Sequence, residues 1–186
     1  MDENTINAGR KLITNVGLVT SNGPVGNNVM SAEWVHRVSS DPFLLAVCLN
    51  PLDATNENIK ATNEFGVSLA AESHNVAGSI AGNYSGREVD KVKTLEELGV
   101  KFYKAEKINA HMVEGAAANY ECKVVEHRKL GSHIMYIGYV VKASYTDANP
   151  IIYHKRKYYK IGAEVQKPDA KALEDMGDVV SKHRKD

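Results

Sequence analysis

The fold class is decided by the stretch Asn119-Tyr-Glu-Cys-Lys-Val-Val125, the turn Leu130-Gly-Ser132 and the run Ile134-Met-Tyr-Ile-Gly-Tyr-Val-Val141. Between positions 120 and 124, apolar or aromatic side chains alternate with charged ones, which is the period of a strand with one buried face. An apolar run then follows a short turn that contains glycine, an arrangement typical of a β-hairpin. The stretch therefore predicts two antiparallel, hydrogen-bonded strands.

Other short apolar or β-branched runs are bounded by Asn, Gly or Pro, which favour turns. They predict further strands over residues 15–21, 29–38, 43–49, 66–70, 150–153 and 158–161. Helices are predicted to begin at the caps Thr55 and Ser73 and at the capping box Thr94-Leu-Glu-Glu97. Gly99 is placed to end the last of these helices. Short strands with a few helices between them predict a mainly β fold, an antiparallel barrel with helical insertions.

The composition is that of a globular protein with balanced charge. The 186 residues slightly exceed the roughly 150 of a typical domain. Lys plus Arg number 23 and Asp plus Glu number 23, which argues against a nucleic-acid partner. No apolar run reaches the roughly 18 residues of a membrane span, and the acidic start lacks a signal-peptide pattern. We expect a cytoplasmic chain without a membrane partner, with one folded domain over residues 1–163 and a polar helical tail over 164–186.

Several common kinds of active site have no signature in this sequence. The histidines are scattered without an HExxH motif, and Cys48 and Cys122 form no CxxC pair, so no metal site is predicted. A GxSxG elbow, which would carry a serine nucleophile, is missing, as are the glycine-rich loops of the standard nucleotide-binding motifs. Cys48 lies inside an apolar run, where a thiol stays protonated and unreactive.

Polar groups that suit an anion do gather at the predicted junctions between elements. Ser31 lies at a predicted strand end, Thr55 and Asn58 lie at a predicted helix start, and residues 85–86 share a polar loop with Lys91. A helix start offers free N–H donors and the positive end of its dipole, which suits a phosphate. Taken alone, Thr55 is most simply a helix cap, so this group of residues indicates a binding site without establishing one.

The strongest indication of function is a set of segments in a characteristic order. They are Asn28-Val-Met-Ser-Ala-Glu-Trp34, residues 38–49, Thr55-Asn-Glu-Asn-Ile59, Tyr84-Ser-Gly-Arg-Glu-Val-Asp-Lys91, Gly131-Ser-His-Ile-Met-Tyr-Ile-Gly138, Pro150-Ile-Ile-Tyr153 and Tyr158-Tyr-Lys-Ile-Gly162. In this order they resemble the flavin reductase-like family, and the later ones resemble its flavoredoxin branch. The resemblance covers about residues 10 to 163, and no single motif within it is decisive.

The resemblance implies a six-stranded antiparallel split β-barrel, known as the FMN-binding split barrel, which forms a homodimer and binds FMN near the subunit interface. Two strand ends, the start of a helix and one loop would contact the cofactor. The residues that match the family's FMN contacts are Met30, Ser31, Ala32, Trp34, Cys48, Leu49, Asn50, Pro51, Thr55, Asn58, Asn83, Tyr84, Ser85, Gly86 and Lys91.

The same resemblance implies an oxidoreductase that passes electrons from NADH or NADPH through the flavin to a second acceptor. That acceptor would be free flavin, a ferric complex or a partner protein, and the sequence does not choose among them. His133 would face the nicotinamide, although a hydrogen-bonded strand histidine is the simpler alternative. Trp34 would either stack near the flavin ring or pack in an interface. Ser132 replaces the acid of the family's Gly-Asp-His turn, so any role of that acid is lost here.

Two other functions stay open at this point. One is a non-enzymatic FMN-binding electron carrier of the flavoredoxin kind, and the other is a structural module that has lost its cofactor. The preference between NADH and NADPH is also undecided, because the sequence has no dinucleotide-binding glycine motif with a ribose-reading acid.

Overall fold

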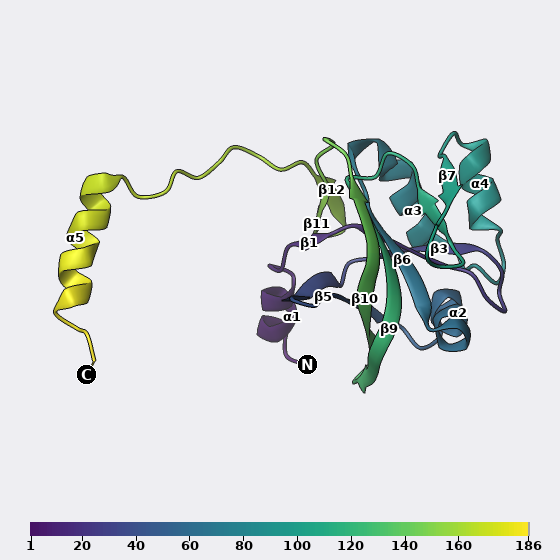
Figure 1. Ribbon diagram of the computed structural model, residues 1–186, viewed down its shortest axis with the longest axis horizontal. Helices are drawn as coiled ribbons and strands as arrows, with labels where there is room; N and C mark the ends of the chain where they lie inside the picture. The colour runs from purple at the N-terminus through teal and green to yellow at the C-terminus, as the bar shows by residue number, and fades with distance from the viewer. Residues whose placement is uncertain (186) are drawn as a thin grey trace.

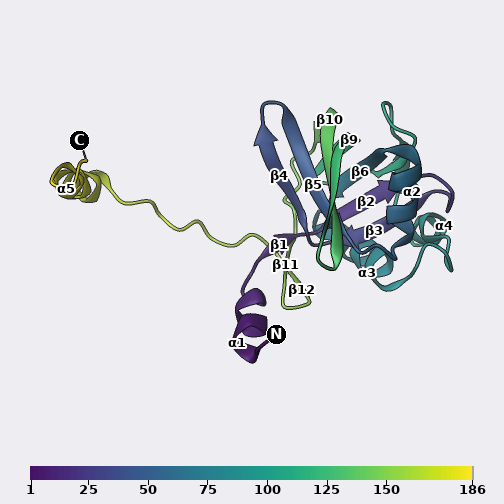
Figure 2. The same ribbon diagram turned by 90° about the horizontal axis from the view of Figure 1, so that it is seen from below.

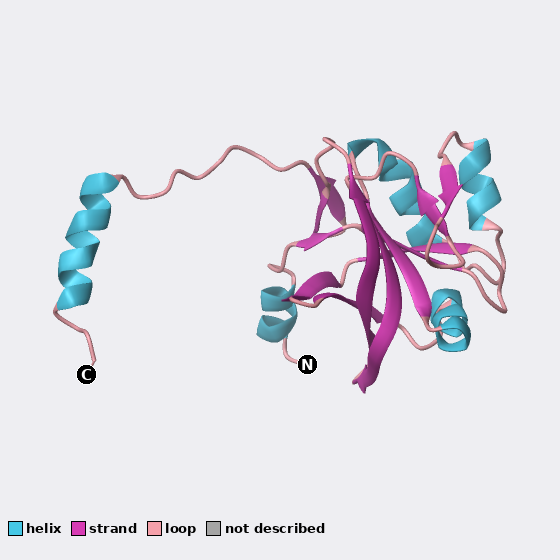
Figure 3. Ribbon diagram, viewed as in Figure 1, coloured by secondary structure: helices cyan, strands magenta, loops and turns pink. Residues whose placement is uncertain are grey.

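The computed structural model describes residues 1–185 and is built around one antiparallel sheet (Figure 1). The order of its strands is β3-β2-β6-β9-β10-β5-β4. Figure 3 shows that strands and loops make up most of the main body, with short helices around the sheet. The bounds of these strands are β2 Gly17–Ser21, β3 Asn28–Ala32, β4 Val35–Ser40, β5 Phe43–Leu49, β6 Glu64–Leu69, β9 Ala118–Leu130 and β10 His133–Tyr145.

The hairpin predicted from the sequence lies at the centre of this sheet. Strands β9 and β10 pair antiparallel from His133↔Leu130 onward and are joined by the two-residue turn Gly131-Ser132. Gly138 permits the close packing of this region, because a Cβ there would lie 2.6 Å from the Phe65 ring. The predicted hairpin is confirmed, and both strands are longer than the sequence pattern indicated.

The predicted single strand over residues 29–38 is wrong. The chain bends between Ala32 and Val35, so that β3 pairs with β2 and β4 pairs with β5. These two strands therefore form the opposite edges of the sheet, and among the described residues they do not pair with each other. The main sheet consequently has seven strands instead of the expected six, within a mainly β fold with helices as predicted.

The hydrophobic core has two large parts, one on each side of strands β2 and β6, and a smaller cluster around Ile108 and Met112. The first lies between the strands of the curled sheet and includes Val47, Phe65 and Tyr136. The second lies between the sheet and helices α3 (Asn75–Asn83) and α4 (Lys91–Glu97), and includes Leu18 and Leu95. A fully buried Leu or Phe contributes about 1.5–3 kcal/mol, so these clusters hold the helices against the sheet.

The helices begin at residues other than the predicted caps. Helix α2 (Ala54–Thr62) has Asp53 as its N-cap, which makes Thr55 its second residue. Ser73 lies inside the short 3₁₀ helix η1 (Glu72–His74), and α3 follows directly. Helix α4 begins after Asp90, whose carboxylate accepts the Lys93 N–H at 3.1 Å, so the expected box at Thr94 is not formed. Gly99, with φ +87°, does end α4 as predicted.

Three smaller parts complete the main body. Strands β1 (Thr14–Asn15), β11 (Ile152–His154) and β12 (Lys157–Tyr159) form a small sheet, and β7 (Phe102–Lys104) pairs with β8 (His111–Val113). Helix α1 (Glu3–Gly9), capped by Asp2, precedes β1 where the sequence predicted no element. The loop after β7 is held by buried Glu121, whose carboxylate accepts the Glu106 N–H at 3.2 Å.

The C-terminal part of the chain lies away from the main body (Figures 1 and 2). Residues 160–169 contain no helix or strand, and α5 (Ala170–Ser181) follows, capped by Asp169. Leu173, Met176 and Val180 on this helix are exposed. The last residue of the predicted tail, Asp186, lies outside the described residues.

Candidate functional site

A pocket of about 320 Å³ lies where β3, the start of α2, the end of α3 and the loop before α4 meet. We call it the polar pocket. It gathers predicted contact residues from three separate stretches of the sequence. Those that line it are Met30, Ser31, Thr55, Asn83, Tyr84, Ser85, Gly86 and Lys91, joined by Asn28, Leu52, Asp53, Ala54, Ala81 and Gly82.

Lys91 provides a buried positive charge in the polar pocket. It is the first residue of α4 and is 2% exposed, and its Nζ donates to the Ala81 carbonyl at 3.3 Å. Burial lowers the pKa of Lys91 to about 8, which the nearby carboxylate of Asp53 partly counteracts. An ammonium has three N–H donors, so Lys91 can donate further bonds to an anion in the pocket.

Asn28 and Thr55 form a second buried polar group beside Lys91. The Asn28 Nδ2 donates to Thr55 Oγ1 at 2.8 Å, while the Asn28 Oδ1 is buried with no partner in the described structure. A Cβ at position 86 would overlap that Asn28 amide, so Gly86 leaves the space open. The orphaned oxygen is an acceptor and suits a ligand hydroxyl.

The start of α2 adds a third feature that favours an anion. The Asp53 carboxylate accepts the Asn50 N–H at 2.9 Å and makes no capping bond to the helix. Burial raises the pKa of Asp53, an effect opposed mainly by that hydrogen bond. The first turn of α2 therefore lines the pocket without a side-chain cap, beside the Asp53 carboxylate, and its N–H groups can donate to an anion there. Lys91, this helix end and the orphaned Asn28 oxygen together fit a phosphorylated polyol such as the side chain of FMN.

Trp34 and His133 form an aromatic pair outside the polar pocket. Their ring centroids are 4.4 Å apart, and the His133 Nδ1 lies 2.8 Å from the Ser132 hydroxyl oxygen. The Trp34 carbonyl accepts the Cys48 N–H at 3.0 Å, which ties the bend after β3 to strand β5. Trp34 is 46% exposed, so part of its side chain is accessible to a ligand.

Other predicted contact residues do not line the polar pocket, and their own contacts are structural. Asn58 is fully buried; its Oδ1 accepts the Val25 N–H at 3.0 Å and its Nδ2 donates to the Gly26 carbonyl at 2.8 Å. Ala32 and Leu49 are buried in the core of the sheet, and Ala32 also lines a smaller space next to the polar pocket. Their contacts account for Asn58 and Leu49 without a ligand.

Asn50, Pro51 and Cys48 lie around the loop between β5 and α2. The Asn50 Oδ1 accepts the Leu52 N–H at 3.0 Å, and the Pro51 carbonyl accepts the Asn56 Nδ2 at 2.8 Å, so these bonds shape the loop. Burial raises the pKa of the Cys48 thiol and raises that of Cys122 to about 12. Both thiols therefore stay protonated at neutral pH, which excludes a thiolate nucleophile at these positions.

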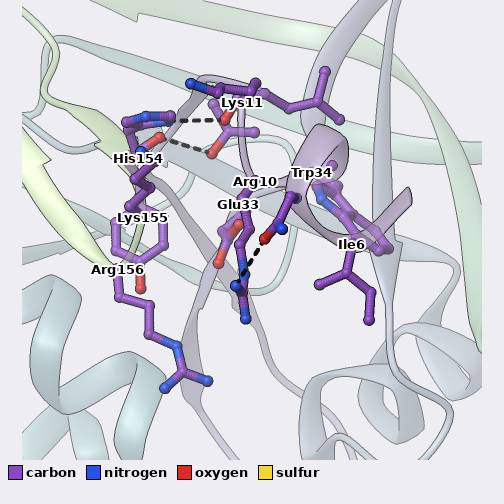
Figure 4. A pocket seen from close by; sticks show the side chains of 13 residues that line it. Ile6, Arg10, Lys11, Glu33, Trp34, His154, Lys155 and Arg156 are labelled. Atoms are coloured by element: carbon purple, nitrogen blue, oxygen red, sulfur yellow. Dashed lines mark hydrogen bonds between the residues drawn. The ribbon is translucent and has the colours of Figure 1, made fainter. Parts of the chain in front are cut away.

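The sequence analysis missed a larger cleft, of about 910 Å³, between α1, the bend after β3 and the β11–β12 hairpin (Figure 4). We call it the basic cleft. Its cations come from two adjacent pairs, Arg10-Lys11 and Lys155-Arg156, which are far apart in the chain. Two doublets of basic residues are too common in sequences to identify a site, and only the β1–β11 pairing brings them together.

The polar pocket and the basic cleft are connected along β3. A smaller space of about 170 Å³ between them is lined by Ser31, which also lines the polar pocket, and by Glu33 and Tyr153, which also line the basic cleft. One long ligand, or two ligands in contact, can therefore occupy this surface.

The described residues contain neither a metal-binding cluster nor a membrane-spanning helix. No group of three or more His, Cys, Asp or Glu side chains within residues 1–185 is placed to hold a metal ion. Within the same range, none of the helices has the length and apolar character needed to cross a membrane.

Comparison with known proteins identifies the family. A family model described as the flavin reductase like domain matches residues 9–162 of the chain. The chain belongs to the flavin reductase-like family. This confirms the resemblance inferred from the ordered segments.

Individual relatives of this family are similar over most of the chain. An FMN reductase (NADH) RutF from Variovorax paradoxus is 27% identical over 158 residues, which are 84% of each chain. The solved structure of the NADH:FAD oxidoreductase SgcE6 from Streptomyces globisporus has a TM-score of 0.77 at 20% identity and covers 88% of this chain and 96% of its own. Flavoredoxin from Methanosarcina acetivorans has a TM-score of 0.74 at 22% identity, covering 83% and 88%. The structural matches establish the flavin reductase-like fold.

Proposed function

We propose that this protein is an FMN-binding oxidoreductase that takes electrons from NADH or NADPH and passes them to a second acceptor. The observation that carries the proposal is the buried ammonium of Lys91 beside the uncapped start of α2, in a pocket that continues along β3 to the Trp34–His133 pair. Membership of the flavin reductase-like family, and the FMN reductase name of a relative, support the choice of cofactor and donor.

In this proposal the polar pocket holds the phosphate and the sugar-like side chain of FMN. Lys91 and the first turn of α2 would bind the phosphate, with charge-assisted hydrogen bonds of about 1.5–3 kcal/mol each. The Asn28 Oδ1 would accept a bond from a hydroxyl of the side chain. Bound FMN would supply the redox chemistry, accepting a hydride and giving up electrons.

The residues of the chain would act by positioning the reacting rings. Trp34 and His133 would hold the nicotinamide against the flavin, which replaces a random encounter by an oriented one. Hydride transfer needs no protein acid in that step, so His133 is proposed as a positioning residue. Neither cysteine is required, because both thiols stay protonated.

We also propose a homodimer, because apolar side chains are exposed on the neighbouring strands β9 and β10 and on the edge strand β4 of the sheet. Val38, Val125 and Tyr139 are each at least 44% exposed and lie on β4, β9 and β10. An obligate dimer buries roughly 2,000 Å² or more in total, and these side chains would form part of such an interface. Light scattering at micromolar protein should give twice the chain mass of 20.4 kDa, and a monomer mass would contradict the proposal.

The function is tested by anaerobic reduction of the purified, FMN-loaded protein. We expect the flavin absorbance to bleach rapidly on addition of NADH or NADPH and to return when an acceptor is added. Bound flavin that neither nucleotide bleaches would instead support the electron-carrier alternative. Failure to bind FMN at all, with the protein folded, would contradict both.

A further inference from the structure

The basic cleft concentrates positive charge in a chain whose total charge is balanced. Arg10 and Lys11 follow α1 on one side, and Lys155 and Arg156 form the tip of the β11–β12 hairpin on the other (Figure 4). All four side chains are exposed, and the only acidic side chain lining the cleft among the described residues is that of Glu33. Arginine and lysine side chains that converge from two walls are the usual way to bind phosphate groups.

The backbone at the hairpin tip is unusual for the residues that occupy it. His154 pairs with Lys157, which leaves Lys155-Arg156 as a two-residue turn. Both residues have positive φ, +48° and +63°, so the turn has the type I′ form that strongly prefers Asn-Gly. Holding two long cationic side chains in this conformation has a conformational cost, and such costs persist mainly at functional positions.

The rest of the structure fixes the position of the tip relative to α1. Thr14 pairs with Tyr153, and the His154 Nδ1 lies 3.2 Å from the Leu12 carbonyl. Because both contacts lie directly beside the two basic doublets, they hold the four cations around one cleft. The charge cluster is thus a consequence of the fold and is not a chance encounter of mobile side chains.

The floor of the cleft offers an aromatic surface as well as charge. Trp34 lines the cleft and packs against His133, and Tyr153 lines both the cleft and the space that leads to the polar pocket. A volume of about 910 Å³ is at the upper end of the range for cofactor sites. A ligand with phosphates at the cations can therefore extend a flat ring toward Trp34 and His133.

We propose that the basic cleft binds the adenosine end of the pyridine nucleotide and recognises its 2′-phosphate, so that the protein uses NADPH in preference to NADH. This inference rests on the proposed function, in which the nicotinamide lies beside His133. The diphosphate bridge of the nucleotide carries about two negative charges, and a phosphate monoester at the 2′ position adds up to two more. The four positive charges of the basic cleft exceed the two negative charges of the diphosphate bridge and match the combined charge of the bridge and the 2′-phosphate.

The direct test measures binding of two isomeric probes of equal charge to the FMN-loaded, full-length protein by calorimetry. Adenosine 2′,5′-bisphosphate carries the 2′-phosphate, whereas adenosine 3′,5′-bisphosphate carries that phosphate on the neighbouring hydroxyl. We expect the first probe to bind at least about 10-fold more tightly, because one charge-assisted hydrogen bond to the 2′-phosphate contributes about that factor in affinity. Equal affinities would overturn the proposal.

The decisive variant is Lys155→Asn/Arg156→Gly, which gives the turn its preferred residues. It should abolish the preference between the probes and raise the KM for NADPH about 10-fold or more, with the KM for NADH nearly unchanged. Its Tm should rise by about 2–4 °C because the strained residues are gone. A preference that survives in this folded variant would overturn the proposal.

A matched control removes the same two charges elsewhere. Arg184→Gly/Lys185→Asn, beyond the end of α5, should change neither the probe preference nor the KM values. A similar loss of preference in this variant would show a general charge effect and would contradict the proposal.

The outcomes also separate the proposed function from the proposal for the basic cleft. If neither nucleotide reduces the flavin but the probe preference and its loss are observed, the proposed function fails and the cleft stands. If both nucleotides reduce the flavin equally well and the probes bind alike, the cleft fails and the function stands.

Discussion

The polar pocket and the basic cleft lie at the two ends of β3, and they hold their positive charges in opposite ways. Lys91 is 2% exposed and packed between helices, whereas the four cations of the basic cleft are exposed. A buried charge interacts strongly with an anion because the surrounding dielectric constant is low, but its side chain also packs in the core, so that replacing it affects stability. Exposed charges are weakened by salt and can be exchanged with little effect on stability. Binding in the pocket should therefore be coupled to folding, and binding in the cleft should not.

The largest effect is expected from Lys91→Met, which keeps the volume of the side chain and removes its charge. The affinity for FMN should fall by about 2–5 kcal/mol, because the phosphate is left without its buried partner. Titration of FMN fluorescence measures the change, and calorimetry with adenosine 2′,5′-bisphosphate should give the wild-type affinity of the basic cleft. Lys93→Met, on the exposed side of α4, is the control and should retain wild-type affinity.

The pKa of Lys91 adds a pH dependence to the same experiment. Since burial lowers this pKa to about 8, the empty pocket loses its positive charge as the pH rises through that value. The affinity of the wild-type protein for FMN should therefore weaken between pH 7.5 and about 9.5. The Lys91→Met protein should show no such decline, and an equal decline in both proteins would assign the effect to another group.

The second effect concerns His133, which lies between the two regions. His133→Ala should slow reduction of the flavin by about 100-fold, the result of misplacing a hydride donor by about 1 Å, and should leave FMN bound. Stopped-flow reduction over a range of NAD(P)H concentrations separates the limiting rate from the apparent dissociation constant. Ser132→Ala keeps the ring and should have a much smaller effect. Wild-type values for both constants in His133→Ala would make it a structural strand residue.

The third prediction tests the coupling of the pocket to the fold. Thr55→Val leaves the buried Nδ2 of Asn28 without its acceptor, which should lower the free energy of unfolding by about 1–3 kcal/mol. The affinity for FMN should fall by a similar amount if the hydroxyl also binds the phosphate. Urea denaturation and FMN titration measure the two quantities. Lower stability with unchanged affinity would restrict Thr55 to a structural role.

The smallest effect comes from His74, which supports η1 at the start of α3. Its Nδ1 accepts the Ala71 N–H at 3.2 Å, so its Nε2 carries the proton and donates to the Glu114 carbonyl at 3.1 Å. Burial lowers the pKa of His74 below the value of 6.5, and the bond to Glu114 only partly offsets this effect. The unfolded chain therefore takes up the proton first as the pH falls.

The stability contributed by neutral His74 is consequently complete above pH 6.5 and is lost as the pH falls below it. The loss should be about 1 kcal/mol, the value of one buried hydrogen bond. Denaturation of the wild-type and His74→Gln proteins at pH 7.5 and 5.5 measures the difference. His183→Gln, near the exposed C-terminus, should keep the wild-type dependence, and an unchanged slope in His74→Gln would contradict the prediction.

The sequence predicted the parts of the molecule in which pattern and packing agree. Local sequence patterns predicted the hairpin of β9 and β10, the buried strand β5 and the family. Alternation of side chains and turns that contain glycine depend on neighbouring residues alone, so they can be recognised in the sequence. The bend that separates β3 from β4 was not predicted, since residues 29–38 read as one continuous strand and only their pairing with β2 and β5 divides them.

The candidate site was partly predictable for a similar reason. Thr55 and Lys91 have polar side chains in the right order, and the fold brings them together in one pocket. In the sequence Asn58 looked equivalent to Thr55. In the structure Thr55 lines the polar pocket, whereas the Asn58 side chain bonds the backbone of Val25 and Gly26, a difference that depends on the packing around α2. The basic cleft could not be found from the sequence, because its two walls are 144 positions apart and meet only through the β1–β11 pairing.

That pairing between Thr14 and Tyr153 also sets an order of events during synthesis. Contacts between distant residues form late, since closing a long loop must precede them. The residues that line the polar pocket lie between Asn28 and Lys91, whereas the tip of the hairpin ends at Arg156, 65 residues later. At about 5–20 residues per second a ribosome needs roughly 3–13 s for that interval. A nascent chain thus possesses every residue of the polar pocket for seconds before the second wall of the basic cleft exists.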